Sequence, residues 1–312
     1  MAGDAGRMPA AQIVVVGDAA VDLVLEVDRI DGLDEKITVQ TSQRRLGGTG
    51  ANAAAVMVAL GSHAELIAAV GDDPFGAWLR GSLASCGVGQ AGVVTRSGAT
   101  TLAVILLGAN GRLVVVDRGV ADELEPGYIA SHLGHADVVY LSSQPAALAA
   151  VVVDSHPGMI VIGLEARQLA QGLHDWLPVL EGADVVLTNR AGGHALRARG
   201  VLSSDRASGR VPIVVTLGAE GCVVYQPGRP GAEIPALRVE AKDATGAGDC
   251  FAGALCHFLG RGADLMTAAR LATAAASLST TAVGAQGYLP DEPSVRQAAR
   301  GLLERVHQPI WR

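Results

Sequence analysis

The chain has 312 residues and a formal net charge of −7 at pH 7; 49% of its residues are hydrophobic and only 3% are aromatic. This length and hydrophobic fraction allow a large core filled by aliphatic side chains. The negative charge argues against a nucleic-acid partner, which requires clustered Lys and Arg. No apolar run reaches the roughly 20 residues that cross a membrane. The four cysteines have neither metal-binding nor disulfide-scaffold spacing, so we expect a cytoplasmic protein.

Two stretches in the first half of the chain carry the pattern of partly exposed strands. Residues 21–27 alternate in period two, which is typical of a strand with one open face. Residues 101–107 and 112–116 are further strand candidates, and the Gly-Ala-Asn-Gly turn between them is a strong hairpin signal. We expect segments 21–46 and 101–116 to form a small sheet outside the main core that acts as a lid. Such a sheet leaves an apolar face to cover, which predicts a homodimer formed through the lid.

Strands and helices alternate regularly from about residue 137 onward. Core strands are predicted at 13–17, 137–141, 159–164, 184–188 and 212–217, and helices at 248–260, 265–283 and 292–306. Short β-branched strands between Ala-rich helical stretches are the mark of a mainly parallel sheet covered on both faces. The predicted fold class is therefore a three-layer α/β/α sandwich with the small β-sheet lid, and the whole chain, 1–312, is predicted to be a single domain.

A first glycine-rich motif, Gly47-Gly48-Thr49-Gly50-Ala51-Asn52-Ala53-Ala54, leads directly into a predicted helix. Glycines let the backbone approach a ligand closely, and the first N–H groups of a helix have no partner within the helix. The Asn52 amide can both donate to and accept from hydroxyl groups. By itself this motif is weak evidence for a binding site, since many ordinary turns into helices are rich in glycine.

A second motif, Asp243-Ala244-Thr245-Gly246-Ala247-Gly248-Asp249, also opens a helix. Gly246, Ala247 and Gly248 can present bare N–H groups to a phosphate at the positive end of the helix dipole. A carboxylate is unwelcome among anion-binding groups unless it has a chemical role, and Asp249 there can accept the proton of an attacking hydroxyl. The alternative is that Asp249 only complements the helix dipole. Neither a Walker loop nor a Gly-x-Gly-x-x-Gly fingerprint follows the first strand.

The two motifs in this order resemble those of the ribokinase (PfkB-type carbohydrate kinase) family, and the resemblance runs from Ile13 to about Pro290. The supporting segments are Gly17–Asp22, Val70–Gly76, Val215–Gly221 and Gly284–Gln286. The resemblance implies ATP-dependent phosphorylation of a hydroxyl on a sugar or sugar-like small molecule. It makes Asp249 the general base and Gly246 to Gly248 the anion hole.

The resemblance also implies the binding residues. Substrate hydroxyls would be held by Asp22, Gly48 and Asn52. The nucleotide would face Asn189, Thr216, Gly218 and Gly221, with Thr273 near the adenine. Mg²⁺ would accompany ATP, and a monovalent cation such as K⁺ would be held by backbone oxygens around Asp243, Thr245, Thr280, Val283 and Gly284.

Departures from the family pattern bear on the substrate. Gly192 stands where the family has a glutamate that helps to organise Mg²⁺, and Thr49 and Gln144 replace a lysine and a glutamate of ribokinases proper. We therefore expect an acceptor other than ribose, such as a fructose derivative, a 2-keto-3-deoxy sugar acid or a nucleoside, with Gln144 among its contacts. Arg118 and Arg167 are candidates to bind a carboxylate or phosphate on that acceptor, although each is also readily explained as a surface charge.

Two other functions are compatible with parts of the sequence. The missing glutamate at position 192 is consistent with a ligand-binding regulator on a kinase fold, whereas the intact Asp249 motif favours catalysis. A nicotinamide-dependent oxidoreductase on a doubly wound sheet is the third hypothesis, and it lacks the dinucleotide fingerprint.

Overall fold

The structure is a computed structural model and describes residues 10–30, 32, 36–203 and 206–302. The ends of the predicted domain, a few positions of the segment 21–46 and the last residues of the helix predicted at 292–306 lie outside the described residues. In the described part of the chain, no helix is both long enough and apolar enough to cross a membrane.

The described residues build a nine-stranded sheet in the order β13-β12-β11-β10-β9-β8-β1-β4-β5. Its strands are β1 (Gln12–Val16), β4 (His63–Gly71), β5 (Val93–Arg96), β8 (Val138–Ser142), β9 (Met159–Leu164), β10 (Val185–Asn189), β11 (Ile213–Thr216), β12 (Cys222–Tyr225) and β13 (Ala232–Ile234). All pairs from β5 to β11 are parallel, and β12 and β13 add an antiparallel edge. The predicted mainly parallel sheet is confirmed.

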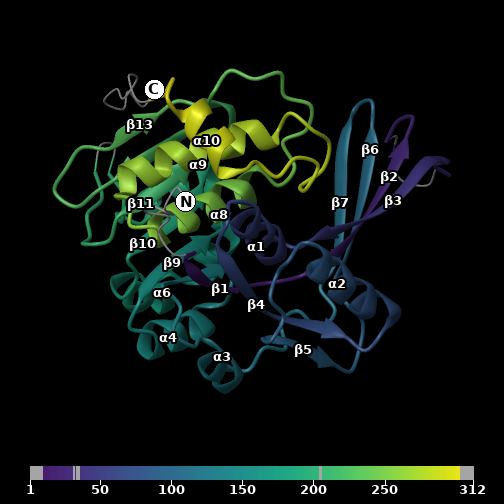
Figure 1. Cartoon of the computed structure of the whole chain (residues 1–312), viewed down its shortest axis with the longest axis horizontal. Helices are drawn as coiled ribbons and strands as arrows, with labels where there is room; N and C mark the ends of the chain where they lie inside the picture. Colours follow the sequence, from purple (N-terminus) through teal and green to yellow (C-terminus); the bar gives the residue numbers. More distant parts are fainter. Residues whose placement is uncertain (1–9, 31, 33–35, 204–205, 303–312) are drawn as a thin grey trace, which may run out of the picture.

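Helices cover both faces of this sheet (Figure 1). One face carries α1 (Thr49–Ala59), α2 (Pro74–Ser85), α8 (Ala247–Gly260), α9 (Leu265–Ser279) and α10 (Glu292–Ala299). The other carries α3 (Pro126–His132), α4 (Ala146–Ser155), α5 (Ala166–Gln171), α6 (Leu173–Glu181) and α7 (Arg190–Ala198). Strand β1 shows why: Ile13 and Val15 join the first core, and Val14 and Val16 join the second. Such alternation is what a strand buried on both faces requires.

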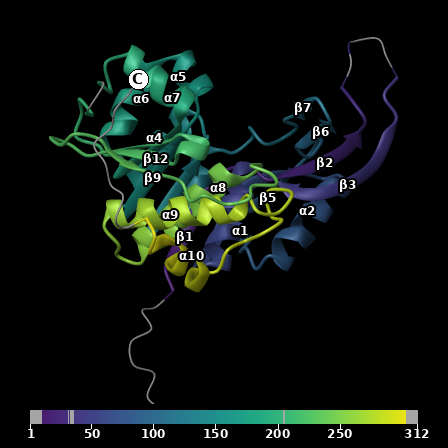
Figure 2. The ribbon, with the colours of Figure 1, turned by 90° about the horizontal axis from the view of Figure 1, so that it is seen from above.

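A separate four-stranded sheet, which we call the lid sheet, projects from the edge of the main body (Figure 2). Its order is β3 (Val39–Gly47), β2 (Ala20–Val27), β6 (Leu102–Gly108) and β7 (Gly111–Asp117). Val24, Ala103 and Ile105 form a small buried cluster on one of its faces. These strands confirm the small sheet predicted from the period-two pattern and the hairpin turn.

Two details differ from the prediction. Strand β4 was not predicted, because its sequence, His-Ala-Glu-Leu-Ile-Ala-Ala-Val-Gly, is rich in good helix formers. Pairing with β1 and β5 makes it a buried strand instead. Two helices also end earlier than predicted. Helix α9 ends at Ser279 rather than at residue 283, and Gly284 adopts a positive φ of 92° in the loop that follows. Helix α10 ends at Ala299, before the predicted end at residue 306.

Candidate active site

The start of α8 gives the second glycine motif its geometry. Gly246 is the N-cap with a left-handed φ of 75°, and a Cβ there would lie 2.5 Å from the Cβ of Ala285, so only glycine fits. A Cβ at Gly248 would instead have no atom within 4 Å. The first N–H groups of a helix lack intrahelical partners and lie at its positive end. The Ala247 N–H already donates to the Ala244 carbonyl at 3.2 Å, whereas the helix start is open at Gly248. The surface at Gly248 is therefore suited to an anion.

Asp249 lies in the first turn of α8, next to this surface. Burial of the carboxyl raises its pKa to about 8, an effect reinforced by the charges of Asp18, Asp22 and Glu165, whereas a hydrogen bond from Asn52 lowers it. A general base works best when its pKa is close to the operating pH. The environment of Asp249 therefore matches that of a base rather than of a solvated carboxylate.

Asn52 connects the two glycine motifs. Its Nδ2 donates to Asp249 Oδ2 at 2.9 Å, and its Oδ1 accepts from Gln286 Nε2 at 3.1 Å. The residue is buried at 6% exposure in the first turns of α1. Gly48 caps this helix with a φ of 91°, and a Cβ there would lie 2.7 Å from the Asp18 carbonyl oxygen. The glycine thus allows α1 to begin close to the end of β1.

A cavity of about 380 Å³ lies between the lid sheet and the loops that flank α8 and follow α9. It is lined by Asp22, Val24, Arg45, Leu46, Ile105, Leu107, Asp243, Thr245, Val283, Gly284, Ala285, Gln286 and Gly287. The lining combines an apolar floor from the lid strands with carboxylates, an amide and a guanidinium. This composition suits a small polar molecule rich in hydroxyl groups.

Asp22 and Arg45 form the charged part of this cavity. They are direct cross-strand partners on β2 and β3. Burial and the nearby Asp18 raise the pKa of Asp22 to about 6, although the charge of Arg45 opposes this. Arg45 Nη1 also donates to the Val283 carbonyl at 3.2 Å. The sequence motifs did not single out Arg45, since its role depends on strand register.

Asp18 is a further carboxylate that the sequence motifs did not assign. Its Oδ1 accepts from Thr49 Oγ1 at 2.9 Å and from the Gly50 N–H at 3.2 Å. Thr49 Oγ1 is also 2.7 Å from Ser142 Oγ at the end of β8. These bonds hold Thr49 in a closed network, so the position where ribokinases carry lysine offers no cation here.

Arg118 and Arg167 both lie among carboxylates. Arg118 Nε donates to Asp122 Oδ2 at 2.7 Å, and Arg167 Nε donates to Glu165 Oε2 at 2.7 Å. The bond to Asp122 raises the pKa of Arg118, with a further contribution from Glu165, and the bond to Arg118 lowers the pKa of Asp122, with a further contribution from Arg167. The four groups therefore form one ionic cluster. Glu165 in turn acts on Asp249, which brings the cluster near the base.

Gln144 is buried, and its amide is used within the protein. Its side-chain Nε2 donates to the Ser142 carbonyl at 3.1 Å, and its main-chain carbonyl accepts from Gln168 Nε2 at 2.6 Å. The structure gives it a packing role, and a contact with the acceptor stays a prediction.

The residues predicted to face a nucleotide gather at the carboxyl ends of β10 and β11. Asn189 and Thr216 are direct partners in the parallel register. Asn189 Oδ1 caps α7 by accepting from the Gly192 N–H at 3.0 Å, which leaves its amide nitrogen for other contacts. Gly218 and Gly221 have φ values of 64° and 100° in the adjoining turn. Ligands of open α/β sheets bind at this edge.

Thr273 lies apart from that edge, in the core. It is 3% exposed, and its hydroxyl donates to the Ala269 carbonyl at 2.8 Å within α9 and contacts Cys222 Sγ at 3.4 Å. Its proximity to an adenine stays a prediction.

Gly192 is packed too closely for a side chain. A Cβ there would overlap Thr188 Oγ1, which donates to the Leu164 carbonyl at 2.7 Å. A glutamate at position 192 would therefore require Thr188 to move.

The loop predicted to hold a monovalent cation is closed by hydrogen bonds. Asp243 accepts from Thr245 N–H at 2.9 Å, from Thr245 Oγ1 at 2.7 Å and from the Gly284 N–H at 2.7 Å. The Thr280 carbonyl accepts from the N–H groups of Lys242 and Asp243. The Val283 carbonyl accepts from Arg45, as described above. These carbonyl oxygens already have donors, and cation binding by them stays a prediction.

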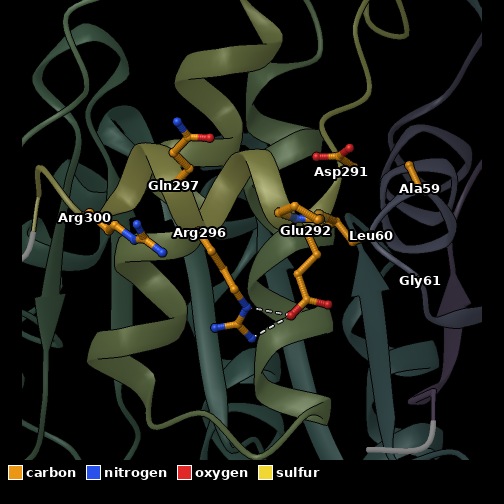
Figure 3. Close-up of a pocket in the computed structure, with 9 residues that line it drawn as sticks. Ala59, Leu60, Gly61, Asp291, Glu292, Arg296, Gln297 and Arg300 are labelled. Atoms are coloured by element: carbon orange, nitrogen blue, oxygen red, sulfur yellow. Dashed lines mark hydrogen bonds and ion pairs between the residues drawn. The ribbon is translucent and has the colours of Figure 1, made fainter. Parts of the chain in front are cut away.

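A separate groove of about 610 Å³ lies between the end of α1 and the face of α10 (Figure 3). Arg296 and Glu292, one turn apart on α10, form an ion pair at 2.6 Å on the α10 side of the groove. It is lined by Ala59, Leu60, Gly61, Asp291, Glu292, Pro293, Arg296, Gln297 and Arg300. None of the residues of the two glycine motifs lines it, so we do not assign it to the reaction.

The fold and the site together define an α/β kinase with a lid sheet. The model of the pfkB family of carbohydrate kinases matches residues 10–292, and the chain belongs to this family. The ribokinase of Bacillus subtilis (strain 168) is 30% identical over 295 residues, covering 91% of this chain and 98% of that protein.

Two solved structures share the fold. The ribokinase of Thermotoga maritima gives a TM-score of 0.81 at 24% identity, covering 93% of this chain and 99% of its own. The ribokinase of Cryptococcus neoformans var. grubii serotype A in complex with ADP gives 0.75 at 26% identity, covering 92% and 99%. The predicted family, the ribokinase-like fold and the assignment as a carbohydrate kinase are confirmed.

Proposed function

We propose that the chain transfers the γ-phosphate of ATP to a hydroxyl of a sugar-like acceptor bound under the lid sheet. The observation that carries this proposal is the placement of Asp249: its carboxyl lies beside the open start of α8, bonds to Asn52, and has a pKa of about 8. The family membership and the ADP complex of a relative support the choice of ATP as the donor.

In the proposed reaction, the acceptor hydroxyl donates a hydrogen bond to Asp249. Its proton passes to that carboxylate as the hydroxyl oxygen bonds to the γ-phosphorus and the bond from that phosphorus to the bridging oxygen of ADP breaks. The N–H groups of Gly246, Ala247 and Gly248 would stabilise the charge on the transferred group. Asp22, Asn52 and the backbone at Gly48 would hold the other acceptor hydroxyls.

Mg²⁺ is proposed to arrive with ATP. It characteristically keeps several waters and binds through substrate phosphates. Because a side chain at Gly192 would overlap Thr188, the protein offers it no carboxylate there. We therefore derive no step through a protein-bound metal.

We further propose that the chain acts as one kinase domain in the cytoplasm. The free thiols Cys86, Cys222, Cys250 and Cys256 support a reducing compartment. A homodimer through the outer face of the lid sheet is supported by its exposed apolar residues, which include Leu113 at 46% and Val115 at 56% exposure. Burial of such a face against a second copy would remove it from water.

We propose that the acceptor is not ribose, since the closed network around Thr49 and the ionic cluster at Arg118 and Arg167 change the polarity of the site. The test is ADP formation with ATP and a panel of ribose, fructose, 2-keto-3-deoxy sugar acids and nucleosides. We expect turnover with at least one acceptor and a higher kcat/KM for it than for ribose. Ribose as the best acceptor would refute the specificity proposal. Nucleotide binding without turnover on any acceptor would refute the kinase proposal and favour a regulator.

A further inference from the structure

Arg112 is the second residue of β7, and its side chain reaches from the lid sheet to the start of α8. Its Nη1 donates to Thr245 Oγ1 at 2.9 Å, although 133 residues separate the two. Thr245 directly precedes the N-cap glycine of α8. A cation from the lid sheet therefore contacts the motif that we assign to phosphate binding.

The strand register explains why Arg112 faces the site. It is the direct antiparallel partner of Leu107, and Leu107 lines the cavity under the lid sheet. Side chains of directly opposed residues lie on the same face of a sheet. The next residues of β7 on this face are Val114 and Val116, the partners of Ile105 and Ala103. Arg112 is thus the charged residue that this strand contributes to the cavity side.

The contact made by Arg112 is a neutral one. Thr245 Oγ1 accepts from Arg112 while it donates to Asp243 Oδ1 at 2.7 Å. By contrast, Arg118 and Arg167 are each bonded to a carboxylate, and Arg45 is engaged with the Val283 carbonyl and Gln43. A guanidinium has five N–H donors, so one bond to a hydroxyl leaves Arg112 able to bind an anion.

Without Arg112, negative charge would predominate near the start of α8 when a nucleotide binds. The carboxylates Asp18, Asp22 and Glu165 all act on Asp249, and an incoming triphosphate adds further negative charge. Burial alone would raise the pKa of Asp243, but hydrogen bonds from Thr245 and Gly284 and the charge of Arg112 lower it below its usual value. The positive charge of Arg112 therefore already stabilises the ionised carboxylate of Asp243 in this loop.

We propose that Arg112 is a catalytic residue that leaves Thr245 and binds the γ-phosphate of ATP during transfer. This inference rests on the proposed kinase function. A charge-assisted bond from a guanidinium to phosphate is stronger than its bond to a neutral hydroxyl, so the exchange is favourable when nucleotide binds. Because Arg112 is carried by the lid sheet, this charge reaches the phosphate only while the sheet covers the site.

The test compares Arg112→Ala and Arg112→Lys with the control Arg44→Ala. Arg44 is on β3 of the same sheet, where it is exposed and its guanidinium lies 6.0 Å from the ring centre of Trp78. Calorimetry measures the affinity for ADP and for a non-hydrolysable ATP analogue, and kcat is measured with the member of the acceptor panel that gives the highest kcat/KM.

For Arg112→Ala we expect an unchanged ADP affinity and an affinity for the ATP analogue about tenfold weaker, as for a lost hydrogen bond to a charged group. The value of kcat should fall by about 10²–10³-fold, the usual loss for one transition-state donor. Arg112→Lys should recover part of the loss, since it restores the charge but not the fork geometry. Arg44→Ala should behave as the wild type.

Other results would overturn the proposal in distinguishable ways. Normal analogue binding and normal kcat in Arg112→Ala would make the residue a tether between the lid sheet and α8, with the kinase function intact. An increase in the KM for the acceptor, with kcat and nucleotide affinity unchanged, would indicate that Arg112 binds the acceptor instead. A wild-type protein that binds neither nucleotide would refute both this inference and the kinase function.

Discussion

The Nδ2 atom of Asn52 donates a 2.9 Å hydrogen bond to Oδ2 of Asp249 across 197 residues of sequence. The bond joins the first turns of α1 and α8, which pack so closely that a Cβ at Gly253 would lie 2.6 Å from the Ala53 carbonyl oxygen. The two glycine-rich helix starts therefore form one site, in which helix packing fixes the position of the base.

The pH dependence of the reaction should report this bond. Asp249 must be ionised to accept a proton, so kcat should rise with pH and level off above its pKa of about 8. Asn52→Leu removes the donor that favours the ionised carboxylate, so the inflection should move to higher pH. The measurement is kcat between about pH 6 and pH 10. An inflection that stays in place or moves to lower pH would contradict this account.

Substitutions of the two glycines at the start of α8 should affect stability and activity differently. Gly248→Ala places its methyl group in open space and replaces a helical glycine, so the fold should be unchanged or up to about 1 kcal/mol more stable. Its activity should nevertheless fall, because the methyl group obstructs the anion surface.

Gly246→Ala serves as the comparison. Its φ of 75° and the close contact with Ala285 should cost roughly 1–3 kcal/mol of unfolding free energy. Thermal unfolding and kcat of the two variants test this pair; equal stability losses would be inconsistent with the geometry.

Asp249 should also lower stability at neutral pH. Its pKa is about 8 in the folded protein and near 3.8 in the unfolded chain, so the folded state binds the proton more tightly. Its contribution to stability is then complete below about pH 4 and is lost as the pH rises through 8. Asp249→Asn should raise Tm at pH 8, by about 2–4 °C per kcal/mol relieved, with a smaller difference at pH 4. A Tm difference independent of pH would argue against the shifted pKa.

The outer face of the lid sheet should mediate dimerisation. Val115 is 56% exposed, so Val115→Asp should hardly affect the stability of a monomer. In a dimer through this face the carboxylate would be buried without a partner and should dissociate the two copies. Sedimentation of the wild type and the variant at micromolar concentration decides this: a monomeric wild type, or a variant that remains dimeric, removes the proposal.

The sequence predicted the parts of the site that depend on local backbone chemistry. The glycine-rich start of the helix suggested an anion-binding surface, and the Asp249 carboxylate beside it suggested a base, before any contact was known. The positive φ of Gly246 and its close approach to Ala285 appear only in the structure. Arg112 and Arg45 could not be predicted in the same way, because their roles follow from strand register in the lid sheet. Likewise Gly192 was recognised as a departure, but its cause, the overlap with Thr188, appears only in the packing.

The most direct test of the account is single-turnover phosphoryl transfer by Asp249→Asn with the true acceptor, alongside calorimetric nucleotide binding. The amide is isosteric with the carboxyl group and keeps a partner for Asn52, so the fold and nucleotide affinity should be retained, or the affinity should rise as a negative charge is lost. Transfer should slow by about 10²–10⁴-fold, the range for a positioned acid or base. Transfer within about threefold of the wild type would show that Asp249 is only a carboxylate at the start of α8.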